Sequence, residues 1–284
     1  MPTPPLAYAF QPHEEIKDGL VRVLGEISAR GQILTRPSRE PTGELIHEGR
    51  LLIKRTRALL WFARPALGLA AHTRAREQLR KAAGLLADQR DLSVTRATLE
   101  RLARKASKPR DRAALAQVFR SLVRDSTAGG ATEKALRQML QKAMKILRQS
   151  ADEIKRSTAA RAAWPSPCER LAEAFRGMRR AGKEARRTGK NADFHEWRKK
   201  AKRLLYQLEL TQADPGRRMA RAMKRVAKLQ NNLGDYHDCV VVEDRLRQVV
   251  PLSSSARRVL RLLKKRKARL RKKACTIARR MPPP

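Results

Sequence analysis

Two motifs recur in the same order along the chain, and this repetition constrains the fold more than any other feature. HEGRLLIKR at residues 47–55 and HEWRKKAKR at residues 195–203 share the pattern His-Glu-x-Arg-x-x-x-Lys-Arg. LADQRDLSV at residues 86–94 and LGDYHDCVV at residues 233–241 share Leu-x-Asp-x-x-Asp-x-x-Val. The offsets are nearly equal, 148 residues for the first motif and 147 for the second. Ordered recurrence at one offset indicates an internal duplication into two similar units.

The segments between turn signals have the composition of helices. Ala, Leu, Arg, Lys and Glu dominate the chain, and all of them favour a helix. Aromatic residues make up only 4%, so a core must be built mainly from Leu, Ala, Val and Ile. We therefore expect an all-α fold, with helices near residues 13–30, 43–64, 68–87, 91–107, 110–126, 131–161, 166–187, 192–212, 216–232, 236–250 and 255–280.

The duplication and the turn signals together predict the domain organisation. A short tail over residues 1–13 is expected to precede one domain that spans residues 14–280. Within this domain we expect a first bundle over about residues 14–126 and a second over about residues 131–280. An approximate two-fold axis would relate two such bundles.

The net charge is the strongest compositional signal. The chain has 66 Lys and Arg residues against 27 Asp and Glu residues, which gives a formal net charge of +39. Charge of this size opposes compaction through self-repulsion, so we expect a polyanionic partner that neutralises it. Nucleic acid, polyphosphate and an anionic membrane all meet this requirement.

The first repeated motif places cationic side chains on one face of a helix, because positions i, i+3, i+4 and i+7 point the same way. In the second half this stripe consists of His195, Arg198, Lys199, Lys202 and Tyr206. The core face of the same helix is apolar and consists of Phe194, Trp197, Ala201, Leu204, Leu205 and Leu208. The first half repeats the stripe with His47, Arg50, Lys54 and Arg57.

A single basic stripe is usually a solvated helix face, but two stripes at equivalent repeat positions suggest one shared basic groove. Arg offers a planar fork of donors and Lys a compact charge, and both suit phosphate oxygens. Asp91 and Asp238 are expected to cap helices or orient basic side chains rather than act as catalytic acids. Further cationic candidates occupy paired repeat positions: Arg74 with Arg221, Lys81 with Lys228, and Arg90 with His237.

With these residues in view, the chain resembles the CHAD domain family over roughly residues 14–280. HEGRLLIKR and HEWRKKAKRLLYQLE, each followed by Leu-x-Asp-x-x-Asp-x-x-Val, look like the two halves of such a domain. The resemblance implies two four-helix bundles with pseudo-two-fold symmetry, and binding of inorganic polyphosphate along a central basic surface, with association with polyphosphate granules. The contacts that it implies are His47, Arg50, Lys54, Arg55, His195, Arg198, Lys202 and Arg203, with Arg74, Lys81, Arg221 and Lys228 as weaker candidates.

A basic protein that binds DNA or RNA at low salt is the main alternative. Residues 256–280 hold 13 Lys or Arg residues and no acid, which suits a phosphate backbone. Base-stacking aromatic residues are scarce, however, and no recognition motif is present.

An enzyme is the less favoured alternative. A zinc helix of the HExxH type needs a second His where Leu51 and Lys199 stand. The sequence has no Walker loop and no carboxylate cluster that would hold magnesium. We therefore expect a binding protein without catalytic residues, metal or cofactor, and the sequence carries no signature of a defined oligomeric state.

Features of the chain that relate to cellular compartment predict a cytoplasmic protein. The first ten residues lack the basic and apolar regions of a signal peptide. No apolar run approaches the ~18 residues of a membrane span, although the basic C-terminal helix leaves membrane-surface binding open. The three cysteines are widely spaced and form no CxxC, so reduced thiols are expected.

Overall fold

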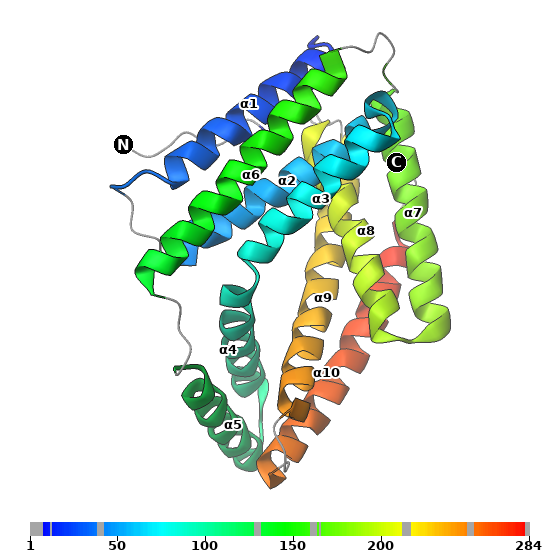
Figure 1. Ribbon diagram of the computed structural model, residues 1–284. Coiled ribbons are helices and arrows are strands. Elements are labelled where there is room, and N and C mark those ends of the chain that lie inside the picture. Colours follow the sequence, from blue (N-terminus) through cyan, green and yellow to red (C-terminus); the bar gives the residue numbers. More distant parts are fainter. Residues whose placement is uncertain are drawn as a thin grey trace.

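The computed structural model describes residues 8–11, 13–38, 43–127, 132–159, 164, 166–211, 217–248 and 253–281. The side chains of residues 88–93, 123–127, 159 and 217–218 lie outside this description. Across the described residues the secondary structure is helical throughout (Figure 1), which confirms the all-α prediction. The helices are α1 (Ile16–Leu34), α2 (Gly43–Leu67), α3 (Leu69–Leu85), α4 (Asp88–Lys105), α5 (Pro109–Thr127), α6 (Glu133–Ala159), α7 (Pro167–Thr188), α8 (Asn191–Leu210), α9 (Arg217–Gln248) and α10 (Ser254–Arg279).

One predicted helix break is wrong. Helices were expected over residues 216–232 and 236–250, but α9 runs without interruption through Gly234. A glycine inside a helix lowers its stability by only about 1 kcal/mol, and Leu233 and Tyr236 on either side of it are buried in one core. The equivalent passage in the first half is broken, because α3 ends at Leu85 before α4 begins.

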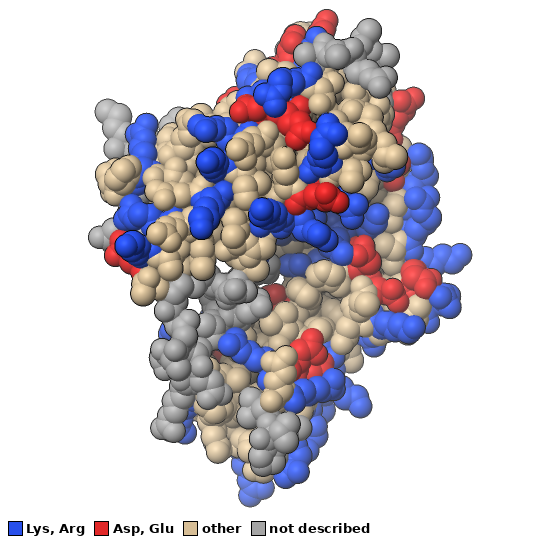
Figure 2. All heavy atoms as spheres, viewed as in Figure 1, with Lys and Arg blue, Asp and Glu red and all other residues tan. Residues whose placement is uncertain are grey.

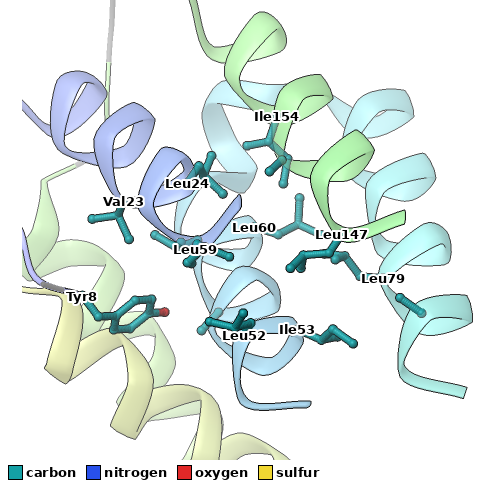
Figure 3. Close-up of a cluster of buried hydrophobic side chains, with 14 of the residues drawn as sticks. Tyr8, Val23, Leu24, Leu52, Ile53, Leu59, Leu60, Leu79, Leu147 and Ile154 are labelled. Carbon is teal, nitrogen blue, oxygen red and sulfur yellow. The ribbon is translucent and has the colours of Figure 1, made fainter. Parts of the chain in front are cut away.

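The first hydrophobic core lies among α1, α2, α3 and α6 (Figure 3). Leu24 of α1, Leu59 of α2, Leu79 of α3 and Leu147 of α6 are all fully buried in it. Tyr8, from the segment before α1, lies at the edge of the same cluster, and its hydroxyl donates to the Arg55 carbonyl at 2.9 Å. These four helices form the upper layer of the molecule in Figure 1.

The second core lies among α4, α5 and α7 to α10. Trp197 of α8 is its largest fully buried side chain. Within this unit α8 packs against α7 and α9, while α10 packs against α5, α7 and α9. Asn232 ties α9 to α10 by donating to the Leu270 carbonyl at 2.7 Å.

The two cores do not coincide with the two halves of the sequence that were expected, residues 14–126 and 131–280. Helices α4 and α5 precede the turn at residues 127–130, yet they pack against α9 and α10. Helix α6 follows that turn but completes the first core with α1, α2 and α3. Each core therefore contains helices from both halves of the chain.

The two units meet where α2 packs against α8. Tyr206 and Leu210, near the end of α8, are buried in the first core. The Leu210 carbonyl accepts from the Phe10 amide at 2.8 Å, and the Phe62 carbonyl accepts from Arg170 of α7 at 3.1 Å. The repeated motif thus lies on both sides of one helix–helix contact. No helix in the described part of the chain is long and apolar enough to cross a bilayer.

Candidate polyanion-binding site

A cleft of about 750 Å³ opens beside the contact between α2 and α8. Helices α2, α4, α6, α8 and α9 supply its walls. Its basic side chains come from both halves of the chain: His47, Arg50, Lys54, Arg101, Arg198 and Lys202. The stripe predicted on α2 therefore supplies His47, Arg50 and Lys54 to this cleft, and the stripe predicted on α8 supplies Arg198 and Lys202.

The cleft continues into a second hollow of about 120 Å³. Lys54 and Lys202 line both spaces, so the two spaces adjoin each other at these lysines. The second hollow adds Arg57 from α2, and Lys199, Arg203 and Tyr206 from α8. Its lining contains five cations and no acid, because its charged residues are Lys54, Arg57, Lys199, Lys202 and Arg203.

A third hollow of about 230 Å³ extends the basic surface towards α7. It shares Trp61 and Arg203 with the second hollow. Arg170 is held there by the carbonyls of Trp61 and Phe62 and by the Glu173 carboxylate. The three hollows adjoin one another along α2 and α8 through shared lining residues, and together we call them the groove.

Arg203 lines both the second and the third hollow. Its guanidinium carbon lies 3.8 Å from the centroid of the Trp61 ring. Burial, first, and then the neighbouring Arg57 cation lower the pKa of Arg203 to about 10. Burial also lowers the pKa of Arg57, and Arg76 adds to this effect. The groove therefore holds cations close together in a partly desolvated place, where a bound anion would relieve their repulsion.

Some cleft residues also have structural roles. Arg50 donates to the Leu86 carbonyl, which follows the last turn of α3. Arg101 of α4 donates to Asp235 at 2.7 Å and to Asp238 at 3.2 Å on α9. Asp238 lies inside α9, so it caps no helix, but it orients a basic side chain as predicted. The side chain of Asp91 lies outside the described residues.

His195 and His237 lie next to the cleft but do not line it. Their Nδ1 atoms are 3.3 Å apart and their ring centroids 4.5 Å apart. Burial lowers the pKa of His195, and the Lys199 and Arg198 cations lower it further. A neutral imidazole is thus favoured while the groove holds no anion.

Arg55 has a different environment from Arg203, although the two occupy equivalent motif positions. Its guanidinium lies over the Tyr8 ring, 4.8 Å from the centroid. Burial raises the pKa of the Glu209 carboxyl, and the charge of Arg55 offsets part of that increase. Arg55 lines none of the three hollows, so the structure places it in a buried polar cluster.

The remaining candidates lie outside the groove. Arg74 is exposed and pairs with Glu153 of α6 at 2.9 Å. Lys81, Arg221 and Lys228 are exposed and line none of the three hollows. The side chain of Arg90 lies outside the described residues. Tyr206 lines the second hollow, but it is only 9% exposed, and burial raises its pKa to about 12.

The repeated motifs did not predict several residues of the groove. Arg101 and Trp61 fall outside the motif positions compared, and Arg170 lies on a different helix from either motif. Trp61 could have been predicted from its spacing, because it follows the last cations of the stripe by one to two helical turns. Among the described residues no three His, Cys, Asp or Glu side chains come together as metal ligands would.

Comparison with known proteins covers nearly the whole chain. Residues 28–247 match the family model of the CHAD domain. The fold is similar to the crystal structure of the CHAD domain from the plant Ricinus communis, with a TM-score of 0.69. That alignment covers 100% of this chain and 98% of the plant domain at 16% identity, so the likeness concerns the fold alone. No curated protein sequence matches the chain.

Proposed function

Because the chain belongs to the CHAD domain family, we propose that its groove binds inorganic polyphosphate without cleaving it, and that this binding associates the protein with polyphosphate granules. The observation that carries the proposal is the convergence of both motif copies on one cleft. Lys54 of α2 and Lys202 of α8 line the same two adjoining hollows. A repeated row of cations suits a ligand that is itself a repeated row of anions.

The shape and charge of the groove support a thin, flexible anion. The three hollows adjoin one another along α2 and α8, so one chain could occupy them in succession. The second hollow, which has no acidic lining residue, is the expected centre of affinity. In the first cleft the two carboxylates, Asp235 and Asp238, are already engaged by Arg101. Phosphate oxygens accept from Lys and Arg wherever the chain lies, so no sequence has to be read.

The binding should depend steeply on salt. By analogy with single-stranded nucleic acid, the slope of log K against log salt should be roughly −0.7 per phosphate neutralised. Removal of two groove lysines should therefore make the slope shallower by roughly 1.4.

The test is titration of labelled long-chain polyphosphate across a salt series with wild type and two double variants. Lys54→Gln/Lys202→Gln removes the two cations shared by adjoining hollows. Lys142→Gln/Lys145→Gln makes the same chemical change on the exposed face of α6. We expect weaker binding and a shallower slope for the groove variant only, and no release of orthophosphate on prolonged incubation.

Equal loss in both variants would mean that the protein attracts polyphosphate only through its overall charge. Release of orthophosphate would show that the protein hydrolyses polyphosphate, and would contradict the proposal of binding without cleavage. Labelled DNA in the same titration separates the two polyanions, because a groove that serves nucleic acid would lose DNA and polyphosphate together.

A further inference from the structure

Helix α10 has a basic face that the groove does not use. Of the 13 Lys and Arg residues in 256–280, four hold the helix to the fold. Three of them form ion pairs: Arg258 with Asp111, Arg266 with Asp235, and Lys267 with Glu243. The fourth, Arg271, lies over the Phe194 ring. The other nine are exposed, and Arg261, Lys265 and Lys272 are central among them. Within the described part of the chain, no ion pair involves these three.

The exposed face of α10 is uniform in its chemistry. Its exposed side chains are basic except for Ser254, Ala268 and Thr276, which are small. At 1.5 Å per residue, a helix of 26 residues is about 39 Å long. The exposed residues of α10 therefore present a row of cations, interrupted only by small side chains, along a helix of that length.

This row lies on a different side of the molecule from the groove. Helix α8, which lines the groove, packs between α7 and α9. Helix α10 packs against the same two helices and against α5, so α8 and α10 occupy opposite corners of their bundle. In Figure 2, Lys and Arg side chains gather along the lower edge of the molecule, where Figure 1 places the start of α10. The basic surface continues onto α7 through a small hollow lined by Arg179, Arg186 and Arg279.

We propose that the exposed face of α10 binds the phosphate backbone of duplex nucleic acid, independently of the groove. The face is convex, unlike the groove, so a thin polyanion would contact its cations from one side only. A duplex is a wide, stiff partner with one charge per ~1.7 Å of axis, and one turn of about 34 Å matches the length of α10. Small side chains between the cations let the backbone approach closely.

The same face argues against other anionic partners. Single strands are held by stacking of bases on aromatic side chains, and α10 exposes none. Helices that lie in a membrane surface bury an apolar face in the lipid, whereas the apolar face of α10 is buried in the second core through Val259, Leu263 and Leu270. Contacts to phosphates carry no sequence information, so we expect binding to duplexes of any sequence.

The test compares two triple variants that change charge equally. Arg261→Gln/Lys265→Gln/Lys272→Gln alters the exposed face of α10. Lys142→Gln/Lys145→Gln/Arg148→Gln makes the same exchange on the exposed face of α6. Gln has nearly the helix propensity of Lys and Arg, and circular dichroism with thermal unfolding checks that both variants fold. Each is titrated with a labelled 24-base-pair duplex, and separately with long-chain polyphosphate, across a salt series.

We expect the α10 variant to lose duplex affinity about tenfold or more, with a slope shallower by roughly 2.7 for three contacts, while the α6 variant stays near wild type. Polyphosphate binding should persist in the α10 variant, and duplex binding should persist in Lys54→Gln/Lys202→Gln. Equal loss of duplex in both triple variants, or no loss in either, would overturn the proposal. So would loss of polyphosphate alone in the α10 variant, since the face would then extend the polyphosphate path. Failure of the groove variant to lose polyphosphate would affect only the first proposal.

Discussion

Arg203 of α8 lies over the indole ring of Trp61 on α2, with 3.8 Å between its guanidinium carbon and the ring centroid. Arg55, 148 residues earlier, lies over the Tyr8 ring, and its charge acts on the half-buried Glu209 carboxyl. The two arginines occupy the same place in the repeated motif. Burial and the Arg57 cation lower the pKa of Arg203, whereas Arg55 compensates the half-buried Glu209 carboxyl, so the same substitution should have opposite effects on stability.

Arg203→Met should weaken polyphosphate binding without destabilising the protein. Burial and the Arg57 cation lower the pKa of Arg203 to about 10, so its charge is held at a cost in the unliganded protein. Met keeps the length and the contact with the Trp61 ring while removing the charge. Thermal unfolding should occur at an equal or higher temperature than in wild type, while titration shows reduced affinity. A lower unfolding temperature would mean that the cation–ring contact dominates.

Arg55→Met should do the reverse. Loss of this cation leaves the half-buried Glu209 carboxyl with less compensating charge, and a carboxylate that is partly desolvated without compensation is destabilising. Urea unfolding should show a lower midpoint, and polyphosphate affinity of the folded protein should change little. A large loss of affinity with unchanged stability would place Arg55 in the groove after all.

Gly182→Ala should destabilise the second core. A Cβ atom at Gly182 would lie 2.7 Å from Cε2 of Trp197, in a ring that is fully buried. Overpacking of this kind typically costs about 1–3 kcal/mol, against a gain in helix propensity of about 1 kcal/mol. The free energy of unfolding, measured in urea, should fall.

Two other glycines serve as controls for that change. A Cβ at Gly177, on the same helix, would meet nothing within 4 Å, so Gly177→Ala should stabilise by about 1 kcal/mol. At Gly49 the nearest atom is the flexible end of Leu140, at 2.9 Å. Gly49→Ala should therefore fall between the other two. Equal effects at all three positions would show that Trp197 has room to shift.

Polyphosphate affinity should increase as the pH falls. Burial and the Lys199 and Arg198 cations lower the pKa of His195 in the unliganded protein. Bound phosphates nearby favour the imidazolium form and raise that pKa, so the complex takes up a proton. The gain in affinity is complete below the unliganded pKa and is lost as the pH rises through the pKa of the complex.

Titrations between pH 5.5 and 8 would check this dependence. His195→Gln should flatten it, whereas His13→Gln, at an exposed position before α1, should leave it unchanged. Affinity that increases with rising pH would contradict the expected proton uptake.

Long-chain polyphosphate should raise the unfolding temperature. A ligand that binds only the folded state stabilises it by about 2.7 kcal/mol at 100 times Kd, which corresponds to a shift of roughly 5–10 °C for a chain of this size. Orthophosphate at the same total phosphorus should give a much smaller shift, because it cannot span several cations. Added salt should abolish the shift. A salt-resistant shift would indicate an interaction other than ion pairing.

Sequence periodicity predicted the local structure well, because burial of one helix face repeats every three to four residues. Phe194, Trp197, Ala201, Leu204 and Leu208 are all buried, as the pattern of α8 indicated. The paired stripes also predicted the two walls that α2 and α8 contribute to the cleft, because helix geometry determines which side chains share a face. Only the uninterrupted course of α9 departed clearly from the helix pattern.

Features that depend on which helices pack together could not be predicted from local patterns. No periodicity says that α4 and α5 join the second core, because an apolar stripe fits any complementary surface. The different surroundings of Arg55 and Arg203 depend on residues from other segments, Tyr8 in one case and Trp61 in the other. Arg101 reaches the cleft only because α4 lies against α9.

The exchange of helices between the two cores also determines the order in which a nascent chain can fold. The first core cannot close until α6 has left the ribosome, although α1, α2 and α3 emerge well before it. Helices α4 and α5 must then wait for α9 and α10, an interval on the order of ten seconds at ordinary rates of synthesis. A gene cut between the two copies of the motif would yield two fragments with incomplete cores. Neither core is contiguous in the sequence, so removal of either copy of the motif with its flanking helices would leave both cores incomplete.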